Sequence, residues 1–148
     1  MTLLNLPNVK NTMNALLISD SFDSFVVHEI NLTNDINLSI QGHMGEYATI
    51  RPIVLEAVKK RDTPSNMRFI LSLSPENIEK TVSSIDTATD PSLISGMFIN
   101  IVYSNGSLNL TTGISYTTFM KDVALEKEWD RLVPIFLSKH NIEFENAQ

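Results

Sequence analysis

The stretch "YSNGSLNLTTG" (residues 103–113) lies between two apolar runs and decides how the centre of the fold is built. Asn105 and Gly106 are the pair that a two-residue type I′ hairpin turn favours, because both central positions need a positive φ. Pairing outward from this turn predicts one register: Ser104 with Ser107, Tyr103 with Leu108, Ile101 with Leu110, Ile99 with Thr112 and Met97 with Ile114. One face of this ribbon is almost wholly apolar, so turn chemistry and hydrophobic alternation favour the same register.

The alternative interpretation of the same stretch is a phosphate-binding loop, because the backbone amides of a glycine-containing loop bind anions. Such a loop needs several glycines and opens a helix. Here a strand pattern follows Gly106. The sequence therefore favours a hairpin over a phosphate site.

The remaining apolar patterns, taken outward from this hairpin, predict four helices, a second hairpin and one further strand. The helices are expected at residues 7–18, between 47 and 64, at 74–85 and at 120–141, the second hairpin at 25–44 and the strand at 67–73. This order predicts an α+β fold, with a mostly antiparallel sheet built from two hairpins plus a further strand and about four helices packed on it. A length of 148 residues suits one domain spanning residues 1–148.

The second hairpin is predicted to have a three-residue loop at 33–35. This loop places Leu32 opposite Ile36 and keeps the apolar residues of both strands on one face. His28 is two residues before Ile30, so the alternating pattern places both side chains on the same face of the strand. We therefore expect His28 at the edge of the core rather than as a metal ligand.

Two prolines and one tryptophan stand out in the predicted helices. Pro52 is expected in the first turn of its helix, and Pro134 is expected to kink or divide the last helix. The last helix carries a broad apolar stripe: Val123, Leu125, Trp129, Leu132, Val133, Phe136 and Leu137. Since Trp129 lies within this stripe, we expect it to anchor the core.

The amino-acid composition indicates the cellular compartment and excludes several kinds of functional site. The chain has no cysteine, which excludes disulfides, thiolate nucleophiles and Cys-ligated metal sites and is compatible with a reducing cytosol. No apolar run reaches the length of a membrane span, and the start of the chain lacks the pattern of a secretory signal. We therefore expect a cytoplasmic protein without a membrane segment.

The formal net charge of −6 is unevenly distributed along the chain. An acidic balance argues against a protein that coats DNA. A local basic cluster, formed by Lys59, Lys60, Arg61 and Arg68, is nevertheless a candidate for anion binding. Basic residues in the last turn of a helix also complement its dipole, and the sequence favours that structural explanation.

No short pattern of metal ligands or activated nucleophiles is present. The histidines, His28, His43 and His140, have no HExxH-type spacing, so neither a metal nor a cofactor is predicted. The serines form no nucleophile elbow and no S-x-x-K pattern. His43, Glu46 and Arg51 lie close together at a predicted strand-to-helix junction, and they are the candidate acid/base and anion-holding groups.

One pair of carboxylates is spaced for joint chemistry. Glu126 and Asp130 lie one helical turn apart, but Lys127 and Arg131 adjoin them. A solvated helix face with ordinary ion pairs explains this pattern better than an acid/base pair.

Five segments carry a family resemblance: "LLISDSFDSF", "IRPIVLEAVKKRDTP", "LSLSPEN", "NIVYSNGSLNLTTG" and "EWDRLVPIFLSKHNIEFE". Together they resemble an uncharacterised bacterial domain-of-unknown-function family of anaerobic Gram-positive species. The likeness runs from about Val9 to Glu145, and its most specific parts are Phe22-Asp23, Arg51-Pro52, Pro64, Thr112-Gly113 and Trp129-Asp130. Since that family has no assigned activity, the resemblance implies no catalytic residue.

Three functions remain open from the sequence. The leading hypothesis is a non-enzymatic cytosolic binding or adaptor domain that contacts another protein through an exposed sheet face or a hairpin edge. The second is nucleic-acid association through the basic cluster, because the element order loosely resembles one repeat of a DNA sliding clamp. The third is an enzyme that acts on a small polar metabolite through His43, Glu46 and Arg51.

Overall fold

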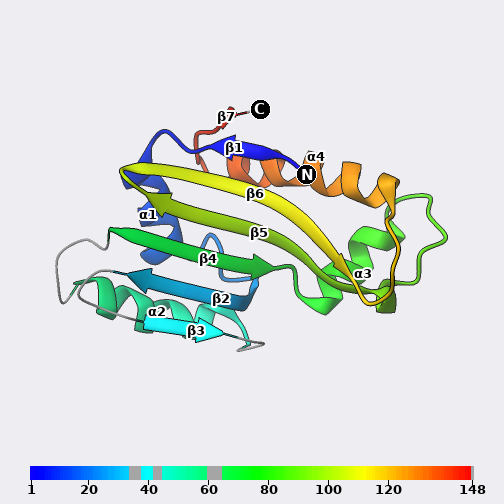
Figure 1. The fold of residues 1–148 in the computed structure, drawn as a ribbon, viewed down its shortest axis with the longest axis horizontal. Coiled ribbons are helices and arrows are strands. Elements are labelled where there is room, and N and C mark those ends of the chain that lie inside the picture. Colours follow the sequence, from blue (N-terminus) through cyan, green and yellow to red (C-terminus); the bar gives the residue numbers. More distant parts are fainter. Residues whose placement is uncertain (34–37, 42–44, 60–64, 148) are drawn as a thin grey trace.

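The computed structural model describes residues 1–33, 38–41, 45–59 and 65–147. Within them, one antiparallel sheet has the strand order β3-β2-β4-β5-β6-β1-β7 (Figure 1). The strands are β1 Leu3–Asn5, β2 Val26–Thr33, β3 Leu38–Gln41, β4 Asn66–Ser72, β5 Ile94–Ser104, β6 Ser107–Tyr116 and β7 Glu145–Asn146. The helices are α1 Val9–Leu17, α2 Tyr47–Lys59, α3 Pro75–Ser83 and α4 Val123–Lys139, with a short 3-10 helix, η1, at Pro91–Leu93. The predicted α+β class is confirmed.

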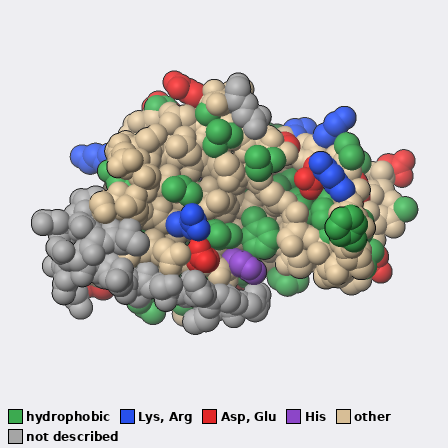
Figure 2. Space-filling model, in the orientation of Figure 1, with side chains coloured by type: hydrophobic (Ala, Val, Ile, Leu, Met, Phe, Trp, Pro, Cys, Tyr) green, Lys and Arg blue, Asp and Glu red, His purple; other side chains and the backbone are tan. Residues whose placement is uncertain are grey.

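The sheet is buried on one face and open on the other. Along β5, Met97, Ile99 and Ile101 are buried, whereas the alternate residues are only half-buried. Buried residues from all four helices join the same core, among them Leu16, Val54, Val82 and Leu137. Figure 1 views the sheet from its open face, with α1 and α4 behind it. Figure 2 shows this open face, where hydrophobic side chains are scattered among polar ones.

The central hairpin has the predicted register. Ser104 pairs with Ser107, and the four pairs predicted further along the ribbon are all present. The turn residues Asn105 and Gly106 have φ values of 53° and 78°. Both lie in the left-handed region that a type I′ turn requires, so the prediction from this dipeptide is confirmed.

Replacing Gly106 with Ala is expected to lower the free energy of unfolding by about 1–2 kcal/mol, because an L residue in the left-handed region costs that much. A Cβ at Gly106 meets no heavy atom within 4 Å, so a steric clash does not contribute. The loss of stability therefore measures the cost of the backbone conformation alone. Gly113→Ala is the matched control, since its Cβ also meets nothing within 4 Å and its φ is not positive. Urea unfolding of both variants measures the difference, and equal losses would contradict this explanation.

The second hairpin has a different register from the predicted one. Leu32 pairs with Leu38, and Ile30 pairs with Ile40. The prediction of a three-residue loop with Leu32 opposite Ile36 is therefore wrong. Ile36 itself lies outside the described residues. A shift of two residues leaves the alternation of faces unchanged, so hydrophobic pattern alone does not separate the two registers.

The prediction for His28 is also wrong. β2 contains a bulge between Val27 and Glu29, and Val27 and Ile30 are both buried. The bulge adds a residue and reverses the alternation, so His28 is exposed instead of facing the core. Its ring packs edge-on against Phe98 of β5, with 4.9 Å between the ring centroids.

Two predictions about the helices are wrong, and one of the two alternatives for Pro134 is excluded. α2 begins at Tyr47, so Pro52 lies inside this helix and not in its first turn. α4 continues through Pro134 as one helix and is not divided there. Val123, assigned to the apolar stripe, is 56% exposed at the start of α4. No helix in the described ranges is long and apolar enough to cross a membrane.

β1 and β7 are absent from the predicted elements. Leu4 of β1 pairs with Leu110 of β6, and β7 pairs with the other edge of β1. These strands have three and two residues. Such lengths are too short for an alternating pattern to be recognised in the sequence.

Candidate functional site

A groove with a volume of about 580 Å³ lies between α3 and α4, over the helical face of the sheet. We call it the α3–α4 groove. Its apolar lining consists of Phe25, Leu73, Ile99, Leu110, Trp129, Leu132, Val133, Ile135, Phe136 and Leu137. Its polar rim consists of Asn77, Lys80, Thr81, Ser84, Glu128, Arg131 and Lys139.

One wall of the groove is formed by α3. Ser74 caps this helix by accepting a hydrogen bond from the Asn77 amide (3.2 Å), and Pro75 occupies its first position, as predicted. Ile78 and Val82 are buried in the core. The rim residues of α3 follow at helical spacing on the neighbouring face: Asn77, Lys80, Thr81 and Ser84.

The opposite wall is formed by α4. A row of residues four apart is buried: Leu125, Trp129, Val133 and Leu137. The next row along the helix surface faces the groove and contains Glu128, Leu132, Ile135 and Lys139. Ile135 is 50% exposed, so apolar surface on this wall is open to solvent.

Trp129 joins the groove to the sheet. Its side chain is 4% exposed, and its indole Nε1 donates a hydrogen bond to the Phe98 carbonyl (2.9 Å). The prediction that Trp129 anchors the core is therefore confirmed. Since it is the only tryptophan of the chain, its fluorescence reports on the groove.

The charges of the rim are mostly basic. Arg131 donates two hydrogen bonds to Glu128, from Nε (2.8 Å) and Nη2 (2.9 Å). This contact lowers the pKa of Glu128 below its usual range and raises the pKa of Arg131. Lys80 contacts Glu76 across one turn of α3 at 3.3 Å. Lys139 has no ion pair with any residue that the structure describes.

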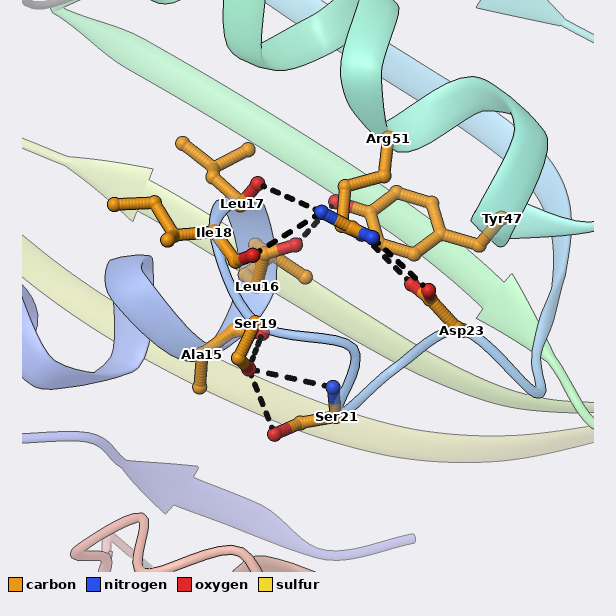
Figure 3. A network of polar contacts seen from close by, with 9 residues as sticks. All are labelled: Ala15, Leu16, Leu17, Ile18, Ser19, Ser21, Asp23, Tyr47 and Arg51. Atoms are coloured by element: carbon orange, nitrogen blue, oxygen red, sulfur yellow. Dashed lines mark hydrogen bonds and ion pairs between the residues drawn. The ribbon is translucent and has the colours of Figure 1, made fainter.

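Of the three enzyme candidates, Glu46 and Arg51 are among the described residues. His43 lies outside those residues, and Glu46 is exposed just before α2. The guanidinium of Arg51 binds both carboxylate oxygens of Asp23, from Nε (2.8 Å) and Nη2 (3.1 Å) (Figure 3). Its Nη1 donates to the Ile18 carbonyl at the end of α1 (3.2 Å).

Arg51 and Tyr47 therefore join α2 to the end of α1. The Tyr47 hydroxyl donates to the Leu16 carbonyl (2.7 Å), and burial raises the pKa of this phenol (Figure 3). The hydrogen bond with Asp23 raises the pKa of the Arg51 guanidinium, which stays charged. Since the carbonyls at a helix C-terminus lack partners within the helix, these side chains supply the donors that α1 needs.

The basic cluster is only partly described. Lys59 lies in the last turn of α2, where it complements the helix dipole. Arg68 lies on the open face of β4, with Nη1 3.6 Å from Glu29 Oε2. Lys60 and Arg61 lie outside the described residues.

The two predicted carboxylate partners in α4 have different contacts from those expected. Asp130 Oδ1 accepts a hydrogen bond from the buried hydroxyl of Thr112, and Glu126 accepts one from the Tyr116 hydroxyl (2.9 Å). Ion pairs of these carboxylates with Lys127 or Arg131 are absent from the described part of the chain. Both carboxylates instead attach α4 to β6, because they lie on the side of the helix that faces this strand.

The start of α4 is held by Asp122. Its Oδ1 accepts a hydrogen bond from the Leu125 amide (3.0 Å), and its Oδ2 accepts from the hydroxyls of Thr87 and Thr89 (both 2.6 Å). These contacts, first that of Thr87, lower the pKa of Asp122 below its ordinary value of 3.8. The cap therefore positions one wall of the groove against the loop that follows α3.

This cap is expected to make stability depend on pH. Because the folded-state pKa of Asp122 lies below the unfolded value, its stabilising contribution is complete above the unfolded pKa and is lost as the pH falls through the folded pKa. Asp122→Asn keeps a capping oxygen but does not titrate. The stability difference between the wild type and this variant should be constant above about pH 5 and shrink below about pH 4. Urea unfolding across this range measures it, and a constant difference would contradict the assignment.

The groove itself was not apparent from the sequence. Residues 77–84 and 128–139 lie far apart along the chain, and helical periodicity shows only which side of each helix faces a core. One signal was present. The apolar stripe of the last helix is broader than contact with a sheet requires, because it includes Leu132 and Phe136 beside the buried row.

The structure thus defines an α+β protein with an open antiparallel sheet and an apolar groove between two helices. Residues 44–145 match a family described as "Family of unknown function (DUF5721)", and the chain belongs to this family. The predicted membership of an uncharacterised family is confirmed. The matched residues include both helices of the groove. No curated protein and no solved structure matches the chain.

Proposed function

We propose that this protein is a non-enzymatic binding protein and that the α3–α4 groove is its ligand site. One observation carries the proposal: the groove has a volume of about 580 Å³ and a mainly apolar lining with a few polar groups at its rim. Ligand sites of proteins commonly have volumes of roughly 300–1,000 Å³ and this kind of lining. A hollow of about 410 Å³ beside Arg68 and Val102 of the open face has a more polar lining, with Asn31, Asn66 and Ser104.

The polar groups of the groove support binding rather than catalysis. Glu128, the carboxylate of the rim, is held by Arg131 with a lowered pKa, so it is charged at neutral pH. The Thr81 hydroxyl donates to the Asn77 carbonyl (2.8 Å), and the Ser84 hydroxyl donates to the Thr81 carbonyl (2.6 Å). These hydroxyls are engaged inside α3, and no described base activates them.

Fluorescence of Trp129 tests the proposal with 1-decanol as a neutral apolar probe. A saturable change is expected, because bound probe lies against the indole ring. Thr81→Phe should weaken decanol binding about tenfold or more by filling the groove from α3. Ser83→Phe is the matched control, since Ser83 is an exposed residue of the same helix outside the groove lining. A linear, unsaturable response, or equal weakening by both variants, would contradict the proposal.

The other hypotheses stay predictions. Contact with a partner protein through the open sheet face or an edge strand is compatible with ligand binding in the groove, because these surfaces lie on different sides of the sheet. Nucleic-acid association would depend on Lys59, Lys60, Arg61 and Arg68 and must weaken with added salt. An enzymatic role would depend on His43, Glu46 and Arg51, and Arg51 is already engaged by Asp23.

A further inference from the structure

We infer that the ligand of the α3–α4 groove is an anionic amphiphile, a long-chain carboxylate whose apolar chain lies in the groove and whose headgroup meets the lysines of the rim. This inference rests on the proposed function and specifies its ligand class. Two observations carry it together, the apolar lining and the sign of the charges around it.

The rim is basic although the protein is acidic. The chain carries a formal net charge of −6, whereas the groove is bordered by Lys80, Arg131 and Lys139 against a single carboxylate, Glu128. Arg131 and Glu128 neutralise each other through two hydrogen bonds, so Lys139 and Lys80 set the sign of the groove, and Lys80 shares its charge with Glu76 outside the lining. Such local complementarity favours an anionic ligand over a cationic one.

Both lysines belong to the lining of the groove, and neither is held in a buried ion pair among the described residues. Lys80 contacts Glu76, but both side chains of this pair are largely exposed, at 70% and 78%. An exposed pair of this kind contributes little, so its exchange for a ligand carboxylate costs little. Lys139 has no ion pair among the described residues. Lysine stems also lie along apolar surface while their ammonium groups stay in water, which suits the edge of an apolar groove.

The apolar lining of the groove would contact the hydrocarbon chain of the amphiphile. Trp129 and Leu132 from α4 and Ile99 from β5 line its interior. The Trp129 N–H is already bonded to the Phe98 carbonyl, so the indole presents only apolar surface to a ligand. A neutral apolar molecule would use this lining but leave the lysines unused. The carboxylate preference is therefore the property that separates the two ligand classes.

Three probes with a ten-carbon chain test the inference: decanoate, 1-decanol and decyltrimethylammonium, each below the concentration at which it aggregates. Trp129 fluorescence reads the affinity of each probe. We expect decanoate to bind about threefold tighter than decanol, because each exposed ion pair contributes little and the one at Lys80 replaces its contact with Glu76. Decyltrimethylammonium should bind more weakly than decanol, and added salt should reduce the decanoate preference.

The double variant Lys80→Gln/Lys139→Gln should lower the ratio of decanoate affinity to decanol affinity to about one. Its affinity for decanol should stay within about twofold of the wild-type value. Lys59→Gln is the matched control, because Lys59 also lies in the last turn of a helix but not at the groove. Equal affinities of wild type for decanoate and decanol would overturn the inference and leave the proposed function standing. Absence of saturable binding by all three probes would overturn both.

Discussion

Trp129→Ala is expected to lower the free energy of unfolding by about 3–5 kcal/mol, the usual range for removing a large aromatic side chain from a core. The side chain is 4% exposed and contacts both the sheet and the groove lining. Its removal also leaves the Phe98 carbonyl without its Nε1 donor. Urea or thermal unfolding of the variant measures the loss.

Two further variants separate packing from hydrogen bonding at this position. Trp129→Phe keeps an aromatic ring but removes the donor, so it should cost about 1–3 kcal/mol through the unpaired Phe98 carbonyl and the reduced volume. Leu132→Ala truncates a half-buried neighbour at the groove and should cost less than Trp129→Ala. A loss below about 1 kcal/mol for Trp129→Ala would contradict the assignment of this residue as a core anchor.

Arg51→Met is expected to destabilise the protein by about 2–4 kcal/mol, because it breaks a partly buried ion pair and leaves its partner without a counter-charge. The side chains of Arg51 and Asp23 are 19% and 21% exposed. The substitution also removes the donor to the Ile18 carbonyl at the end of α1, while Met retains the apolar stem. The loss should appear in urea unfolding and should loosen the packing of α1 against α2.

Arg131→Met is the control for this prediction. Arg131 also makes two hydrogen bonds to a carboxylate, but it is 60% exposed and its partner Glu128 lies three residues away on the same helix. Its removal should therefore cost much less than the removal of Arg51. A double-mutant cycle of Arg51→Met with Asp23→Asn should give a coupling of about 1–3 kcal/mol. Equal losses for the two arginine variants, or no coupling in the cycle, would contradict this account of the contact.

The central hairpin was predictable because its cause is local. Asn105 and Gly106 determine the turn, and the turn determines every pair in the ribbon. The same was true of α3, where Ser74 and Pro75 mark the first turn. The second hairpin lacked such a turn signal, and hydrophobic alternation allowed two registers that differ by two residues.

The bulge beside His28 was not predictable from alternation, because inserting one residue reverses the pattern on which the prediction depends. The contacts between elements far apart in the sequence could not be predicted for a different reason. Asp23 and Arg51 are 28 residues apart along the chain, and no local rule pairs them. The groove is a property of how α3 and α4 pack on the sheet, so its lysines had no recognisable motif.

The segments that carried the family resemblance contact each other in the folded chain. Asp23 of one segment binds Arg51 of another, and Thr112 of a third binds Asp130 of a fourth. These contacts hold α1 against α2 and α4 against β6. Four of the most specific parts of the resemblance therefore contain residues whose contacts position the elements of the fold, and the fifth, Pro64, lies outside the described residues.

The most direct test of the central claim, that the α3–α4 groove binds an apolar ligand, is a methyl NMR titration with 1-decanol. Methyl groups of Ile99, Leu110 and Leu132 line the groove, whereas those of Ile70 and Val102 lie on the opposite face of the sheet. Saturable shifts are expected in the first set and unchanged signals in the second. Shifts confined to Ile70 and Val102, or unchanged signals throughout at saturating probe, would contradict the claim.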